Sequence, residues 1–332
     1  MQKIASKIQE KIFLTTNFNF DEIALELFHF QYTYNPIYKQ FVDHLKINVK
    51  NVNEIVKIPF LPIEFFKTHR IICQHAPTQK IFESSGTTGQ INSKHFVSEL
   101  KLYEQSFEKA FVEFYGSIED WTFLALLPSY LERDTSSLVY MMNDLILKSK
   151  KPNSGFYLHN LADLKQQIIQ TQQQANSKIM LIGVTFALLD FAEQFPMDLS
   201  KIVLMETGGM KGRRRELMRE EVHQILQQAF SVSKIHSEYG MTELLSQAYS
   251  YGDGIFKSPN WMKVLKRDIY NPFFISDEKG RGGLNVIDLA NIYSCAFIAT
   301  QDIVHLMADN EFSVLGRIDN ADIRGCNLMV TL

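Results

Sequence analysis

The sequence has few cysteines, little net charge and no long apolar run. Its three cysteines, Cys73, Cys295 and Cys326, show no CxxC pair, no metal-ligand spacing and no disulfide framework, which favours the reducing cytoplasm. A net charge of −3 over 332 residues gives no reason to expect a nucleic acid or an anionic membrane as partner. No segment reaches the run of about 18 apolar residues that a membrane span needs. The composition therefore predicts a cytoplasmic protein without a membrane span.

The N-terminal part, residues 1–78, is predicted to be a mostly helical leader packed on the core. Ile4, Ile8 and Ile12 recur at helical spacing between charged residues, which predicts an amphipathic helix and lacks the apolar centre of a signal peptide. Aromatic residues are frequent in this leader, and we expect them to pack in the core because no basic residues alternate with them.

Residues 79–250 alternate between strand and helix patterns. The apolar run WTFLALLPS (121–129) is typical of a strand buried on both faces. Helices are expected after Ser98, after Ser136–Ser137 and near Gly212, the last with Met218, Val222, Ile225 and Ala229 on one face. This order predicts an α/β fold with a doubly wound, mostly parallel sheet, and the glycine-punctuated segments of residues 251–332 predict a smaller β-rich subdomain.

The stretch SSGTTGQINSK (84–94) is the strongest candidate for a ligand-binding loop. Gly86 and Gly89 allow the backbone to close on a ligand. The hydroxyls of Ser84, Ser85, Thr87 and Thr88, together with the backbone amides, suit phosphate oxygens, and Lys94 adds a charge. The Walker A pattern is absent. The alternative is a surface hairpin turn between strands at 80–83 and 94–98.

Three further polar stretches follow predicted strands: LPSYLERDTSS (127–137), ETGGMKGRRR (206–215) and SEYGMTE (237–243). Open α/β sheets bind ligands beyond the carboxyl ends of their strands, so we expect these stretches to share a pocket with the 84–94 loop. Tyr239, Thr242 and Glu243 could stack a base, bond a phosphate and hold Mg²⁺, respectively. The alternative for 206–215 is a solvated basic face at the start of a helix, and the alternative for 237–243 is a polar corner between a strand and a loop.

Four motifs in the same order resemble the adenylate-forming superfamily, which activates carboxylic acids with ATP. They are the 84–94 loop, EYGMTE (238–243), TQDIVHL (300–306) and GRIDNADIRG (316–325). Within that superfamily the chain resembles the acyl-protein synthetase (LuxE) family. The segments that carry this are IPFLPIEFFK (58–67), LPSYLERDTSSLVYM (127–141), ETGGMKGRRREL (206–217), HSEYGMTELLSQ (236–247) and RGCNL (324–328).

The resemblance implies a role for each matched residue. The β- and γ-phosphates would be held by Ser84, Ser85, Gly86, Thr87, Thr88 and Gly89, with Lys94 nearby, the α-phosphate by Thr242, and Mg²⁺ by Glu243. Adenine would be bordered by Gly208, Gly209, Tyr239 and Gly240, and ribose would be held by Asp302 and Arg317. Cys326 would accept the acyl group. Apolar walls for the acyl group are expected near 127–137 and 182–186.

The implied activity is ATP-dependent activation of a carboxylic, and specifically a fatty, acid, followed by acyl transfer to a cysteine. A protein acyl acceptor or a reductase is the implied partner. The resemblance ends at the hinge motif, so we expect the mobile C-terminal domain of acyl-CoA ligases to be missing. Two alternatives stay open: a phenylacetate-type ligase or acyltransferase with another acceptor, and a non-catalytic nucleotide-binding subunit of a complex.

Overall fold

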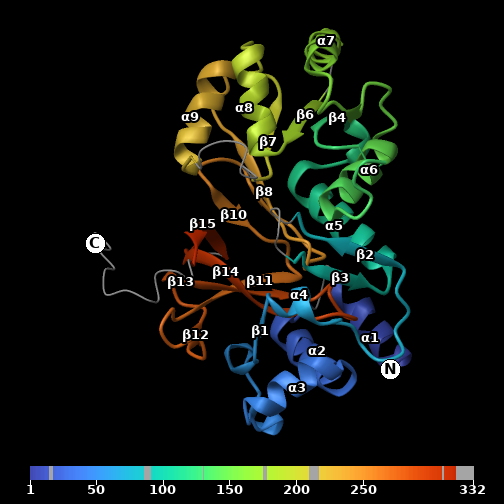
Figure 1. The fold of residues 1–332 in the computed structure, drawn as a ribbon, viewed down its shortest axis with the longest axis vertical. Helices are drawn as coiled ribbons and strands as arrows, with labels where there is room; N and C mark the ends of the chain where they lie inside the picture. Colours follow the sequence, from blue (N-terminus) through green and yellow to red (C-terminus); the bar gives the residue numbers. More distant parts are fainter. Residues whose placement is uncertain are drawn as a thin grey trace.

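The computed structural model describes residues 1–14, 18–85, 91–129, 131–174, 178–208, 217–308 and 310–318. Thirteen of the described strands form one sheet, whose main path runs β12-β11-β13-β14-β15-β10-β9-β8-β7-β6-β4-β5 (Figure 1). No helix among these residues is both long and apolar enough to cross a membrane.

Five neighbouring strands form the parallel part of the sheet. They are β4 (Trp121–Leu126), β5 (Gly155–Phe156), β6 (Lys178–Gly183), β7 (Val203–Glu206) and β8 (His236–Tyr239). Every residue of β4 is buried, which confirms the strand predicted from the 121–129 run. Helices connect these strands, as in other α/β folds with buried parallel sheets.

The connecting helices cover both faces of the parallel strands. They are α5 (Leu100–Tyr115), α6 (Ser137–Ser149), α7 (Leu161–Gln172), α8 (Thr185–Gln194) and α9 (Arg219–Phe230). Figure 1 shows α8 and α9 on one side of the strands and α5 and α6 on the other. The fold class expected from the sequence, an α/β fold with a parallel, doubly wound sheet, is therefore confirmed.

Two of the predicted helix starts, after Ser136 and after Ser98, have different outcomes. Ser136 caps α6, because its hydroxyl accepts a hydrogen bond from the Val139 N–H at 3.4 Å. Ser98 does not cap α5; there the Gln79 side chain accepts from the Leu100 N–H instead.

Gly212, near which a third helix start is predicted, lies outside the described residues; in the described part the backbone at Met218 is extended and α9 begins at Arg219. The Glu221 carboxylate fixes this start by accepting from the Met218 N–H at 2.9 Å. The buried face of α9 consequently differs from the predicted one and comprises Val222, His223, Leu226 and Phe230.

The C-terminal strands continue the same sheet in antiparallel pairing. They are β9 (Ala248–Ser250), β10 (Ile255–Lys257), β11 (Met262–Arg267), β12 (Ile275–Ser276), β13 (Gly280–Asp288), β14 (Phe297–Leu306) and β15 (Glu311–Arg317). Because β8 pairs with β9, the parallel and antiparallel parts are hydrogen-bonded to each other.

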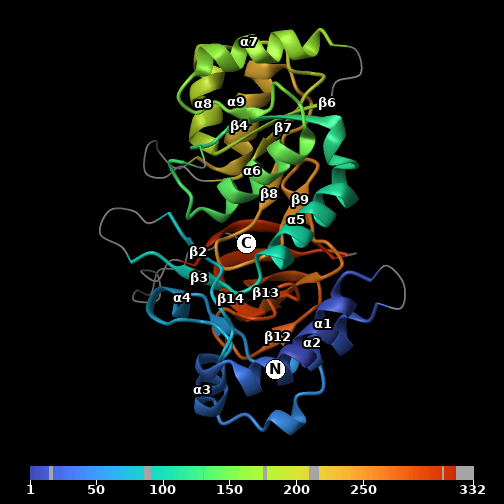
Figure 2. The ribbon, with the colours of Figure 1, turned by 90° about the vertical axis from the view of Figure 1, so that its right-hand side faces the viewer.

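The N-terminal elements lie against the antiparallel strands, at the end of the molecule opposite α7 (Figures 1 and 2). They are α1 (Gln2–Ile12), α2 (Phe20–Tyr34), α3 (Pro36–His44), β1 (Leu61–Pro62) and α4 (Phe65–Thr68). Buried side-chain amides fix this packing: Gln31 donates to the Asn291 and Ile292 carbonyls, and Asn35 donates to the Ser294 carbonyl. Phe28 and Tyr38 are fully buried, which confirms the core role predicted for these aromatics.

The segment before α5 forms a separate hairpin of β2 (Lys80–Glu83) and β3 (Lys94–Val97). Figure 2 shows this hairpin beside α4. The strands expected on both sides of the 84–94 loop are therefore confirmed.

Candidate functional site

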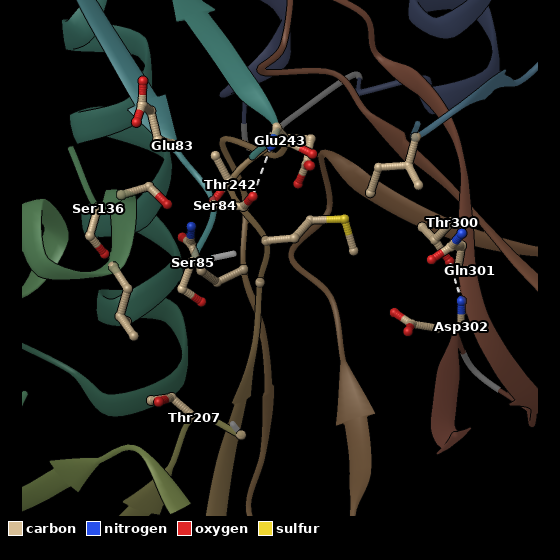
Figure 3. Close-up of a pocket in the computed structure, with 18 of the residues that line it drawn as sticks. Glu83, Ser84, Ser85, Ser136, Thr207, Thr242, Glu243, Thr300, Gln301 and Asp302 are labelled. Atoms are coloured by element: carbon tan, nitrogen blue, oxygen red, sulfur yellow. Dashed lines mark hydrogen bonds between the residues drawn. The ribbon is translucent and has the colours of Figure 1, made fainter. Parts of the chain in front are cut away.

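One cavity of about 400 Å³ collects residues from all the polar stretches that the sequence singled out. It lies where the ends of the parallel strands meet the β2–β3 hairpin and strand β14 (Figure 3). Of the predicted site residues, those that line the cavity are Ser84, Ser85, Gly208, Gly240, Thr242, Glu243, Asp302 and Arg317. Figure 3 shows Asp302 on the side of the cavity opposite Ser85 and Ser136.

The base of the predicted phosphate loop is closed by two hydrogen bonds. The Ser84 N–H donates to the Ser93 carbonyl at 3.0 Å, and the Ser93 N–H donates to the Ser84 hydroxyl at 2.9 Å. The sequence left open a hairpin turn or a ligand loop; the hairpin is present, and its end borders the cavity. Gly86, Thr87, Thr88 and Gly89 lie outside the described residues, as do Gly209 and Cys326.

The role of Lys94 beside the phosphates stays a prediction. Its exposed ammonium pairs with Glu83 at 3.3 Å, and Lys94 is not among the residues that line the cavity.

The turn at Gly208 is held from below by Glu206, a buried carboxylate at the end of β7. Glu206 accepts from the Gly208 N–H at 2.8 Å and from the Ser237 hydroxyl at 3.0 Å. Burial opposes ionisation of Glu206, but contacts with His223, Arg219 and the Gly208 N–H outweigh it and hold its pKa below the usual value. The φ of Gly208 is +73°, a conformation that glycine adopts without strain.

The Thr242–Glu243 turn rests on two buried side chains that sequence reasoning missed. The His95 ring contacts the Thr242 carbonyl at 2.8 Å through Nδ1 and Asn291 Oδ1 at 3.1 Å through Nε2. Asn291 Nδ2 donates to the Glu243 carbonyl at 2.9 Å. Burial lowers the pKa of His95 to about 4. A histidine directly after Lys94 on a short strand points to the opposite face, and this alternation is the signal that could have found it.

Glu243 faces the cavity and is only 4% exposed. Burial raises the pKa of its carboxyl, while a hydrogen bond from Ser93 opposes that rise. Among the described residues, no group of three or more His, Cys, Asp or Glu side chains could hold a metal. A single carboxylate beside phosphate oxygens is nevertheless a common Mg²⁺ arrangement, so Glu243 fits the predicted role.

Asp302 and Arg317 stand directly opposite each other on β14 and β15. The Arg317 Nε lies 3.5 Å from Asp302 Oδ1, and the Arg317 side chain is 78% exposed. Tyr239 donates its hydroxyl to Asp302 at 2.7 Å, while its ring packs edge-on against Phe256 and Phe312. Tyr239 is not among the cavity-lining residues, so its stacking on adenine stays a prediction.

The cavity also contains charged and polar side chains outside the predicted set. Among them are Glu64, Lys67, Glu83, Arg133, Glu238, Gln247 and Gln301. Lys67 and Arg133 add two cations to Arg317 in a lining that also holds acidic side chains.

Comparisons with known proteins identify the fold. No protein-family model matches the sequence, and no curated protein matches it. The structure is similar to ATP-bound MatB from Rhodopseudomonas palustris, with a TM-score of 0.53, 15% identity and coverage of 74% of this chain and 49% of that one. It is also similar to 2-hydroxyisobutyryl-CoA ligase in complex with 2-HIB-AMP and CoA, with a TM-score of 0.66, 13% identity and coverage of 90% and 68%.

These likenesses show that the chain has the fold of the N-terminal domain of adenylate-forming enzymes. The chain spans about half the length of the MatB structures it matches.

Proposed function

We propose that the protein activates a carboxylic acid with ATP as an acyl-adenylate and then transfers the acyl group to a thiol. The observation that carries the proposal is that predicted site residues from separate parts of the chain line one cavity: Ser84 and Ser85, Gly208, residues 240–243, and the pair Asp302 and Arg317. These segments are far apart in the sequence, and the same fold holds ATP in MatB and an acyl-AMP in 2-hydroxyisobutyryl-CoA ligase.

In the first step a carboxylate oxygen attacks the α-phosphorus of ATP. The bond between the α-phosphorus and the bridging oxygen breaks, and pyrophosphate leaves. The protein's part in such a reaction is positioning and charge stabilisation. In this proposal Thr242 hydrogen-bonds the α-phosphate, Ser84 and Ser85 contact the β- and γ-phosphates, and Asp302 and Arg317 hold ribose. Glu243 would hold Mg²⁺, which supplies positive charge to the phosphates.

In the second step a thiolate attacks the acyl carbonyl, the acyl–phosphate bond breaks and AMP leaves. The resemblance to acyl-protein synthetases makes Cys326 the proposed acceptor, with Arg324 favouring its thiolate. CoA or a carrier protein are the other acceptors that this chemistry allows. A radiolabelled acid with ATP should label the wild-type protein and leave Cys326→Ser unlabelled, whereas equal labelling of both would remove Cys326 from the proposal.

An ATP–pyrophosphate exchange assay with a panel of acids tests the first step. We expect exchange that depends on an added acid and falls at least about 100-fold in Thr242→Val, because the lost contact strengthens in the transition state. Asp277→Ala is the matched control, since Asp277 is exposed and does not line the cavity. Wild-type protein that binds ATP but shows no exchange with any acid would contradict the proposed function and favour a nucleotide-binding subunit.

A further inference from the structure

One end of the cavity has no role in the proposed nucleotide site. It is formed by residues of α5, α6 and β8 and of the segment before β9: Tyr103, Ser137, Leu138, Met141, Glu238 and Gln247. Apart from Gly240, which the resemblance assigns to the border of adenine, the residues proposed for the nucleotide belong to the other walls, so this end is left for the acid.

The apolar walls expected from the sequence are largely missing at this end. Leu127 and Phe186 are buried but do not line the cavity, and within residues 182–186 only Val184 does. Leu138 and Met141 supply apolar surface, but Glu238 and Gln247 stand beside it.

Glu238 brings a carboxyl group to this end, and no described residue donates a hydrogen bond to it. Its Oε1 lies 2.4 Å from the position that a Cβ of residue 240 would take, so a larger residue at position 240 would displace this carboxyl group. Burial and the negative charge of Glu206 raise the pKa of Glu238 to about 8. Tyr103 and Tyr249 are the other titratable groups that interact with this carboxyl. The Tyr103 hydroxyl is already engaged, because it donates to the Ser137 carbonyl at 2.9 Å.

Gln247 is the second polar group without a partner at the same place. It is only 4% exposed, and its Oε1 is buried with no hydrogen-bond donor among the described residues. Its Cγ lies 3.4 Å from the same Cβ position above Gly240, so Gln247 and Glu238 border one point of the cavity. A buried acceptor without a donor, such as Gln247 Oε1, is rare in folded proteins and points to a bound partner, and the half-buried Glu238 carboxyl lies beside it.

We propose that the acid activated here is polar and carries a hydrogen-bond donor, a hydroxyl or an ammonium group, that Glu238 and Gln247 receive. This inference rests on the proposed function and names its substrate class. An alkyl chain would leave both acceptors desolvated and unpartnered, which is the condition under which a site rejects an analogue most strongly.

A fatty acid would need a different place. A second cavity of about 590 Å³ has mostly apolar walls, among them Phe41, Ile58, Phe60 and Phe273, and it shares Glu64, Thr300 and Gln301 with the first. It borders the first cavity next to Asp302, the ribose-binding residue of the proposal, and not at the Glu238 end.

The test is ATP–pyrophosphate exchange with butanoic acid, with the hydroxybutanoic and aminobutanoic isomers that match it in size, and with decanoic acid as a longer alkyl acid. For the wild-type protein we expect kcat/KM for the best hydroxy or amino acid to exceed that for butanoic acid at least about 100-fold. Glu238→Leu should reduce this ratio at least tenfold, mainly through KM for the acid, and Gln247→Leu should reduce it less. Glu238→Gln separates the two donors, because a neutral amide accepts from a hydroxyl as the protonated Glu238 does, whereas an ammonium group would favour the ionised carboxylate, which glutamine does not supply.

Each outcome bears on a different claim. Equal or better use of butanoic or decanoic acid by the wild type would overturn the inference and leave acid activation intact. An unchanged preference in Glu238→Leu and Glu238→Gln, with both variants folded, would also overturn it. If ATP binds but no acid supports exchange, the proposed function itself fails, and this inference fails with it.

Discussion

Replacement of His95 by alanine tests how the Thr242–Glu243 turn is supported. The His95 ring is fully buried, contacts the Thr242 carbonyl and Asn291 Oδ1, and packs edge-on against Phe66 with 5.8 Å between ring centroids. Because burial keeps the ring neutral, it donates through only one of its two nitrogens, so the substitution removes one hydrogen bond, which contributes about 1 kcal/mol, and the buried groups left behind add to this. With the cavity that the ring leaves, we expect His95→Ala to lower the free energy of unfolding by about 3–5 kcal/mol.

The same substitution should also reduce exchange activity, because Thr242 loses the contact that fixes its backbone. We expect a loss of about 10–100-fold in kcat at temperatures where the variant is still folded. Urea denaturation measures the first effect and ATP–pyrophosphate exchange the second. His159→Ala is the control, since His159 is exposed and pairs only with Glu132 among the described residues. A stability change below about 1 kcal/mol with normal exchange would refute this role of His95.

Three further predictions concern charges and a hydroxyl at the cavity. Glu238→Gln should gain stability over the wild type as pH rises from about 5 to 8, by up to about 1.4 kcal/mol per pH unit. The folded-state pKa of Glu238 is raised to about 8, so over this range only the unfolded wild type releases the proton, and the wild type loses stability. Equal changes of stability with pH in both proteins, measured by urea titration, would contradict this. Lys67 lines the cavity, so Lys67→Met should raise KM for ATP about tenfold and weaken the salt dependence of this KM. Lys50 is exposed and does not line the cavity, so Lys50→Met should change neither. Equal kinetics for both variants would remove Lys67 from the site. Tyr239→Phe should raise KM for ATP about five- to tenfold by freeing Asp302, and an unchanged KM measured by exchange would show that this bond does not matter for ATP.

The sequence was most informative where burial and chemistry coincide. The run at β4 is buried at every position, so its apolar continuity alone predicted a strand buried on both faces. Ser84, Thr242 and Glu243 carry polar groups just beyond strand ends, and topology predicts that such groups meet, whereas Asp302 lies within β14. The sequence pattern could not show that β8 pairs with β9 and so joins the two parts of the sheet, because strand pairing is a long-range contact.

The residues that sequence reasoning missed act through their surroundings and not through a motif. Glu206 and Asn291 are ordinary polar residues until the fold places backbone groups of the site beside them. Glu238 was read only as part of the EYGMTE motif. Its alternation with Tyr239 puts it on the same strand face as Gly240, and the vacant Cβ position of Gly240 is what lets the carboxyl enter the cavity.

The central claim is that this cavity joins a carboxylate to the α-phosphorus of ATP. The most direct test uses an acid that supports exchange, labelled with oxygen-18 in its carboxyl group, with hydroxylamine as acyl acceptor and mass analysis of the nucleotide product. If the carboxylate attacks the α-phosphorus, one labelled oxygen remains on AMP after acyl transfer, and pyrophosphate carries none. Unlabelled AMP, or label found in phosphate released with ADP, would contradict the account.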